Sequence, residues 1–146
     1  LKPPPGKLRF EITESAAIAH LPLAAELIAD FSAVGCRFAL DDFGSGLCSF
    51  GYLQSLPVDE VKIDGRFVRS MISDPVSAEI VRAIHQVARA TGKKTVAEFV
   101  DDPRQLVALR SIGVDYAQGW LFHPAVSPEK LRELLCSESA ATPAAS

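Results

Sequence analysis

The chain has 146 residues, of which 48% are hydrophobic and 23% charged, a composition typical of a globular domain and unlike that of a disordered or collagen-like chain. Fifteen basic residues stand against 18 acidic ones, and the formal net charge of −3 offers no basic surface for a nucleic-acid backbone. We therefore expect one domain or part of one, with neither DNA nor RNA as a partner. A single small nucleotide stays compatible with this charge, because bound metal cations can supply positive charge.

The cysteines and the hydropathy pattern bear on the setting of the chain. Cys36, Cys48 and Cys136 are odd in number and form no C-x-x-C pair, which argues against a disulfide framework and a structural zinc site. No apolar run approaches the roughly 20 residues that span a bilayer, and the start has no signal-peptide core. We expect a cytoplasmic setting without membrane contact from this segment. Because no initiator Met is present, we expect a piece of a longer parent, which could itself be membrane-attached.

Strand and helix patterns alternate along the chain. Short runs rich in β-branched and aromatic residues predict strands over residues 8–14, 37–43, 60–64, 94–99 and 115–121. Helical spacing predicts a helix over 22–34 and three more that begin at Pro75, Pro103 and Pro128. In the first helix Leu23, Leu27 and Phe31 share one apolar face. We expect residues 1–7 to form a linker, 8–136 the folded domain and 137–146 a disordered tail.

This alternation predicts an α/β fold with a parallel sheet, either doubly wound or a (β/α) barrel. Strands buried on both faces of a parallel sheet are normally apolar throughout, but these strands carry polar residues. The polar residues on or beside the strands are Glu11, Asp41, Asp42, Lys62, Asp64, Glu98 and Gln118. In a barrel such residues gather at the carboxyl ends of the strands, where active sites are built, and the sequence therefore favours the barrel.

The predicted cluster consists of oxygen donors, with one amine and no histidine, which suits Mg²⁺ or Mn²⁺ better than Zn²⁺. Asp41 and Asp42 are adjacent, and two neighbouring carboxylates repel each other unless a cation lies between them. Two such ions could support phosphoryl chemistry, with Lys62 holding a water or a phosphate oxygen. Any one of these acids could instead cap a helix. The Gly44 and Gly46 turn that follows is a candidate ligand loop.

Four other residues have ordinary interpretations. His20, His85 and His123 lack the spacing of a metal site, and we expect them on helix surfaces or in solvent. Trp120 follows a predicted strand end, where it could stack on a base or pack in the core.

Five ordered motifs resemble those of the EAL-domain family, bacterial phosphodiesterases that hydrolyse the second messenger cyclic di-GMP. They are FEITES (10–15), ALDDFGSG (39–46), LPVDEVKIDGRFV (56–68), TVAEFV (95–100) and AQGWLF (117–122). The resemblance runs from Leu8 to Pro124 and implies metal-dependent signal-transduction chemistry. The chain departs from the family pattern at Ser45, at Leu47 and Cys48, and at 99–101, where Phe-Val-Asp replaces Gly-Val-Glu.

The resemblance assigns roles to the polar residues. The metal set it implies is Glu11, Asp41, Asp42 and Glu98, and the catalytic set is Glu98, Lys62 and Asp42. Lys62 would contact the catalytic water or Glu98, Glu14 would steady the loop after Asp42, and Gln118 would lie near the guanine nucleotide. The loop and ligand set is Glu14, Phe43, Gly44, Ser45, Gly46, Asp64, Gln118 and Gly119.

The resemblance also implies that part of the family's domain precedes this chain. The Glu-Ala-Leu motif and a metal-binding Asn cannot be placed here, so the chain would supply roughly the last five units of a (β/α)₈ TIM-type barrel. Two metal ligands would then be absent, and we expect a cyclic di-GMP phosphodiesterase domain whose fragment is inactive alone. The alternative is a regulatory module that binds cyclic di-GMP or a protein without cleaving it. Open sheet edges would favour a homo-oligomer or docking with the rest of the barrel.

Overall fold

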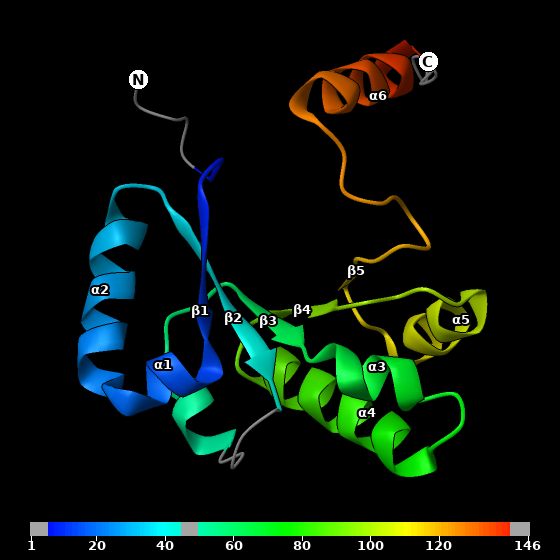
Figure 1. Cartoon of the computed structure of the whole chain (residues 1–146). Coiled ribbons are helices and arrows are strands. Elements are labelled where there is room, and N and C mark those ends of the chain that lie inside the picture. The colour runs from blue at the N-terminus through cyan, green and yellow to red at the C-terminus, as the bar shows by residue number, and fades with distance from the viewer. Residues whose placement is uncertain (1–5, 45–49, 141–146) are drawn as a thin grey trace, which may run out of the picture.

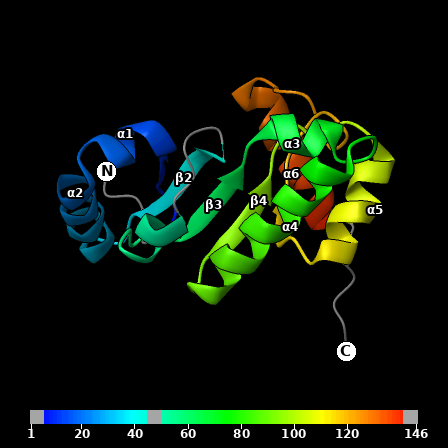
Figure 2. The ribbon, with the colours of Figure 1, turned by 90° about the horizontal axis from the view of Figure 1, so that it is seen from below.

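A five-stranded parallel sheet forms the centre of the molecule (Figure 1). The computed structural model describes residues 6–44 and 50–140, and the side chains only up to residue 134. The strands are β1 (Arg9–Thr13), β2 (Arg37–Phe43), β3 (Glu60–Ile63), β4 (Lys94–Ala97) and β5 (Tyr116–Ala117). They pair in chain order, and Figure 2 shows β2, β3 and β4 side by side. Because every neighbouring pair is parallel, the sheet is a consecutive part of a (β/α) barrel, as the sequence predicted.

Four strands end earlier than predicted, at the carboxyl edge of the sheet. β1 stops at Thr13, β3 and β4 stop at Ile63 and Ala97, and β5 has only two residues. The chain leaves the extended conformation in this region, at Phe99 with φ of 55° and at Gly119 with φ of 154°. The polar residues Asp64, Glu98 and Gln118 therefore lie just beyond the strands rather than within them.

Four long helices accompany the strands: α2 (Leu21–Ala33), α4 (Pro75–Ala90), α5 (Pro103–Ile112) and α6 (Pro128–Ala140). Their predicted starts are confirmed within one residue. The carboxylate of Asp74 accepts hydrogen bonds from the first-turn amides of α4, and that of Asp102 does the same for α5. Gly113 ends α5 with φ of 98°, a conformation that glycine adopts without a steric penalty.

Three short helices were not predicted: α1 (Glu14–Ala19), the 3₁₀ helix η1 (Phe50–Gln54) and α3 (Gly65–Ser70). Each has at most six residues, which is too short to display helical periodicity. The caps explain two of them, because Thr13 accepts a hydrogen bond from the first turn of α1 and Asp64 does so for α3.

The prediction that α2 buries the apolar face of Leu23, Leu27 and Phe31 is wrong. Ala24 and Ile28 are the buried residues of this helix, while Leu23, Leu27 and Phe31 are exposed. The helix is apolar on two sides, so periodicity alone could not tell which side meets the sheet. Leu27 and Phe31 instead line a shallow apolar groove, together with Phe10 of β1 and Phe38 of β2.

The main core lies between the sheet and α4, which packs across β3 and β4. Ile84 and Ala88 of this helix are buried. His85 is also buried, at 5% exposure, so the expectation of a surface position is wrong for this residue. It lies inward because its imidazole Nδ1 is 2.9 Å from the hydroxyl of Thr95 in β4.

The end of the chain differs from expectation as well. α6 continues to Ala140, so the predicted disordered tail begins too early. Figure 1 shows α6 standing apart from the sheet after an extended segment. None of the helices in the described residues is long and apolar enough to cross a membrane.

Candidate functional site

The parallel register brings polar side chains from several strands to one edge of the sheet. Thr13 of β1 pairs with Asp41 of β2, and Ile63 of β3 pairs with Ala97 of β4. The residues at the carboxyl ends of these strands therefore face a common mouth, as the sequence predicted from parallel pairing.

Lys62 lies at the centre of this mouth and is 6% exposed. Its Nζ donates a hydrogen bond to Glu11 Oε2 at 2.9 Å. The same ammonium forms ion pairs with Asp41 Oδ1 at 2.7 Å and with Glu98 Oε1 at 2.9 Å. One buried cation thus links carboxylates from three different strand ends.

Two opposing effects set the charge state of Lys62. Burial by itself lowers the pKa of the ammonium, but the contacts with Asp41, Glu11 and Glu98 outweigh it and raise the pKa above its usual value. The lysine therefore remains protonated throughout the physiological range. It acts as a fixed positive charge and a hydrogen-bond donor at the mouth.

Glu98 is buried at 6% exposure beside the last strand. Burial raises the pKa of its carboxyl, and the negative charges of Asp41 and Asp42 act in the same direction, whereas Lys62 lowers it. The side-chain amide of Gln118 donates a hydrogen bond to Glu98 Oε1 at 3.0 Å. Gln118 and Lys62 together fix the orientation of this carboxylate.

Asp41, Asp42 and Glu98 form a cluster that fits a divalent cation. Each offers a carboxylate oxygen, and these oxygens all lie within 4.8 Å of one another. Asp41 Oδ1 is buried, and apart from its 2.7 Å ion pair with Lys62 it has no donor among the described residues. Oxygen donors with spare lone pairs are the ligands that Mg²⁺ and Mn²⁺ prefer. Glu11 lies at the edge of this cluster with its side chain half exposed.

The backbone at Asp42 is unusual, with φ of 54°. Aspartate tolerates this left-handed conformation better than most residues do. In a regular strand, adjacent side chains point to opposite faces of the sheet. The turn at Asp42 breaks this alternation, and both carboxylates reach the same cluster. Phe43, the next residue, is fully buried and packs near the rings of Phe50 and Tyr52. It belongs to the core and does not reach the mouth, unlike its expected place in the ligand loop.

Glu14 is 1% exposed and contacts Gly44, directly after β2, and Tyr52 of η1. Its Oε2 accepts a hydrogen bond from the Gly44 amide at 3.0 Å, and its Oε1 accepts one from the hydroxyl of Tyr52. The carboxylate thus bridges the two ends of the segment between β2 and η1. Ser45 and Gly46 lie outside the described residues.

Two other predicted site residues have evident local contacts. The carboxylate of Asp64 caps α3 and forms an ion pair with Arg66, the helix-cap alternative that the sequence left open for the acids. Gly119 lies against the backbone of Val100, where a Cβ atom would be 2.3 Å from its amide nitrogen.

Trp120 is 73% exposed, which excludes packing in the core of the described structure.

Sequence reasoning did not identify Tyr52 or the role of Phe99. Phe99 follows Glu98 with φ of 55°, a conformation that is uncommon for a bulky residue and strained. Its ring packs on Gly65, where an added Cβ would be only 2.1 Å away, and the Arg69 guanidinium lies 4.3 Å from the ring centre. The signal was present in the sequence, because phenylalanine replaces the glycine of the EAL pattern at this position.

The fold and the mouth together define the class of domain: a parallel β/α barrel unit with a carboxylate and lysine cluster at its carboxyl edge. The profile of the EAL domain family matches residues 1–125, so the chain belongs to this family and the resemblance is confirmed.

Known relatives of the chain are considerably longer. Cyclic di-GMP phosphodiesterase PdeB of Shewanella oneidensis is 47% identical over 111 residues, which is 76% of this chain and 13% of that protein. Cyclic di-GMP phosphodiesterase PdeF of Escherichia coli is 37% identical over 115 residues, 79% of this chain and 15% of that protein. The chain thus spans less than a fifth of these relatives.

Solved structures of the family share the fold. The EAL domain of Mycobacterium smegmatis DcpA has a TM-score of 0.85 and 36% identity, with 92% of this chain and 60% of that chain covered. The PaMucR phosphodiesterase in complex with c-di-GMP has a TM-score of 0.83 and 35% identity, with 87% and 51% covered. These similarities confirm the predicted fold class.

Proposed function

We propose that the domain to which these residues belong is a cyclic di-GMP phosphodiesterase, which opens the cyclic dinucleotide to linear pGpG with Mg²⁺ or Mn²⁺. The observation that carries the proposal is the cluster of Asp41, Asp42 and Glu98 oxygens within 4.8 Å, next to the Lys62 ammonium. Relatives that bear the name cyclic di-GMP phosphodiesterase support the choice of substrate.

Asp41, Asp42 and Glu98, with Glu11 at the edge, would hold the cation, which when bound supplies Lewis-acid activation of a water and of the phosphoryl group. Lys62 stays charged beside these carboxylates and would donate to an anionic phosphoryl oxygen or to a water in place of one of its carboxylate partners. Gln118 holds Glu98 in place through its amide. Glu14 anchors Gly44 close to the carboxylate pair.

The substrate would lie across the exposed rim of the mouth. Gln118 is exposed and adjoins Glu98, so its amide would lie beside the substrate. Trp120, also exposed, supplies an aromatic surface two residues further on. A guanine base can stack on such a ring, so we assign this side of the mouth to the nucleoside.

The second candidate is recognition of cyclic di-GMP without cleavage. One observation favours it: Lys62 contacts the carboxylates of Glu11, Asp41 and Glu98 directly. The cluster therefore has positive charge among its acids without a bound metal ion, and its shape does not depend on one. Binding in EDTA distinguishes this function from the first.

The test is incubation with cyclic di-GMP and Mn²⁺, or with EDTA, followed by chromatography for the linear dinucleotide. It is run on the 146-residue chain and, where this chain is part of a longer protein, on that protein. In the longer protein we expect metal-dependent product that is lost on Asp42→Asn and retained on Asp30→Asn, an exposed acid on α2. Tight binding in EDTA without product from either protein supports the second function. The absence of both binding and product would contradict both functions.

A further inference from the structure

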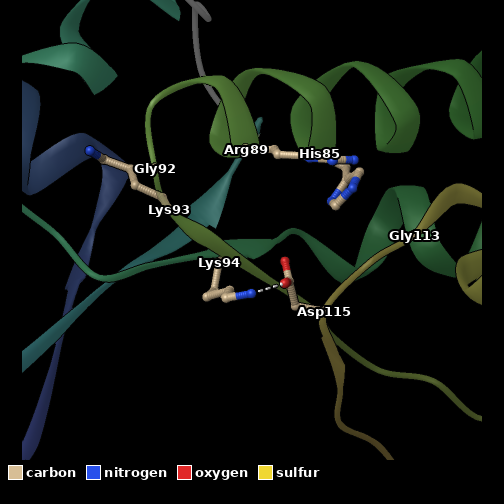
Figure 3. A pocket seen from close by; sticks show the side chains of 7 residues that line it. All are labelled: His85, Arg89, Gly92, Lys93, Lys94, Gly113 and Asp115. Carbon is tan, nitrogen blue, oxygen red and sulfur yellow. Dashed lines mark hydrogen bonds and ion pairs between the residues drawn. The ribbon is translucent and has the colours of Figure 1, made fainter.

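A polar pocket lies at the end of the sheet opposite the acidic mouth. It has a volume of about 380 Å³ and is bordered by His85 and Arg89 of α4, the start of β4 at Lys94, and Gly113 and Asp115 before β5 (Figure 3). None of these residues belongs to the site proposed above, so the pocket needs an explanation of its own.

A chain of hydrogen bonds fixes the proton on His85. Asp115 Oδ2 accepts from the Thr95 amide at 2.9 Å and from the Thr95 hydroxyl at 3.1 Å. Burial by itself raises the pKa of Asp115, but the contacts with Lys94 and Thr95 lower it below the usual value, so this acid is an ionised acceptor. The single hydroxyl proton of Thr95 is therefore donated to Asp115. The hydroxyl oxygen, 2.9 Å from His85 Nδ1, must then accept a hydrogen bond from the imidazole.

The other ring nitrogen of His85 is directed into the pocket. A Cβ atom at Gly113 would lie 3.4 Å from His85 Nε2, which places this nitrogen at the pocket wall. In the neutral form of an imidazole, a proton held on Nδ1 leaves a lone pair on Nε2. This nitrogen makes no hydrogen bond within the described part of the chain, although the side chain is 95% buried. The pocket thus contains a fixed and unused acceptor.

Arg89 supplies the charge of the pocket. It is exposed, forms no ion pair among the described residues, and projects from α4 on the same side as His85 (Figure 3). Lys94 Nζ is engaged with Asp115 Oδ1 at 2.7 Å, and the Lys93 side chain extends away from His85. The three basic side chains that line the pocket outnumber Asp115 together with the partial negative charge at the ends of α4 and α5, so the lining is net positive.

We propose that this pocket binds an oxyanion that carries its own proton, namely hydrogen phosphate. Arg89 pairs with the anionic oxygens, and the P–OH group donates a hydrogen bond to His85 Nε2. Sulfate has the same shape but no proton near neutral pH, so it would set an oxygen lone pair against the imidazole lone pair. The proposal is independent of the phosphodiesterase function.

The test follows the histidine ring nitrogens of the ¹⁵N-labelled chain by NMR at pH 8, where ordinary imidazoles are neutral. We expect inorganic phosphate to shift His85 Nε2 saturably at millimolar concentration, and sulfate at equal ionic strength to bind at least about tenfold more weakly. His20 and His123 are exposed and serve as internal controls in the same spectrum.

Two variants locate the anion. Arg89→Gln should weaken phosphate binding by about tenfold, in keeping with the loss of a charged hydrogen-bond donor. Arg82→Gln removes the same charge two turns earlier on α4, outside the pocket, and should leave binding unchanged. The proposal is overturned if phosphate causes no saturable shift of His85, or if sulfate causes an equal one. It is also overturned if all three histidines shift equally, or if Arg89→Gln leaves the midpoint of the phosphate titration unaltered.

Discussion

Lys62 stabilises the cluster of carboxylates at the mouth when no metal ion is bound. Three carboxylates lie within 2.9 Å of its ammonium, and Lys62 and Glu98 are both nearly inaccessible to solvent. Carboxylates placed this close repel one another unless positive charge lies among them. The lysine therefore stabilises the same arrangement that makes the site able to bind a metal ion.

Replacing this lysine tests its structural role. Lys62→Met should lower the free energy of unfolding in EDTA by about 3 kcal/mol, because it leaves a buried carboxylate without its partner. Added Mn²⁺ should restore part of this loss by supplying the missing charge. Urea unfolding measures both effects. Lys94→Met removes an exposed partner of Asp115 and should cost under about 1 kcal/mol. Equal losses in the two variants would contradict the account of Lys62.

At the scale of elements, the carboxyl ends of β4 and β5 are joined by backbone contacts beyond the last strand pairs. The Val100 amide donates to the Gln118 carbonyl at 3.0 Å, and the Leu121 amide donates to the Val100 carbonyl at 3.0 Å. Gly119 permits this approach because it has no side chain. This packing places Gln118 against Glu98.

Gly119→Ala should disrupt this junction. Its Cβ would lie 2.3 Å from the Val100 backbone, and because backbone cannot yield locally, we expect a loss of about 3 kcal/mol in the free energy of unfolding. Gly92→Ala is the matched control: its φ of 74° is also left-handed, but no atom lies within 4 Å. That variant should cost only about 1 kcal/mol. Comparable losses in denaturant titrations would show that conformational strain, not the close contact, matters at Gly119.

The start of β4 is tied to β5 by Asp115, and this tie gives a pH dependence. Because the pKa of Asp115 is lowered in the folded chain, its stabilising effect is full above the unfolded value of about 3.9 and is lost as pH falls through the folded value. Asp115→Asn should therefore flatten the acid limb of stability against pH. Thermal unfolding between about pH 2 and 6 measures it. Asp30→Asn, at an exposed position, serves as control. If stability depends on pH as steeply in Asp115→Asn as in the wild type, Asp115 is not the source of this dependence.

The sequence predicted the parts of the fold that depend on regular patterns. The alternating elements and the helix starts at proline followed from periodicity and start signals, whereas the closeness of Lys62 to Glu98 was implied by the resemblance to the EAL family. The short helices α1, η1 and α3 could not be predicted, because they depend on caps and on tertiary packing rather than on period. The same applies to His85, whose burial depends on a hydroxyl partner ten residues away in sequence.

At the scale of the whole molecule, the sheet has two free edges. Within the described residues no strand pairs with the outer edge of β1 or of β5. Beside β1, the Phe10 ring stacks on Phe38 with centroids 5.3 Å apart and meets Phe31 edge-on at 5.6 Å, yet it remains 36% exposed. Unpaired edges with apolar surface favour association with another chain or with further strands of a barrel.

We expect the isolated chain to self-associate through this edge. Sedimentation velocity should show an average mass that rises with protein concentration, and Phe10→Lys should reduce the rise by placing a charge in the aromatic cluster. Val107→Lys introduces the same charge at an exposed position of α5 and should have no effect. A monomer at every concentration would contradict this expectation.

The central claim is that the carboxyl edge of this sheet binds a divalent cation through Asp41, Asp42 and Glu98. The most direct measurement is Mn²⁺ binding by electron paramagnetic resonance, on the chain and on Asp42→Asn. We predict saturable binding by the chain, weakened at least about tenfold in Asp42→Asn and unchanged in Asp30→Asn. Equal Mn²⁺ affinity in the chain and in Asp42→Asn would contradict the claim.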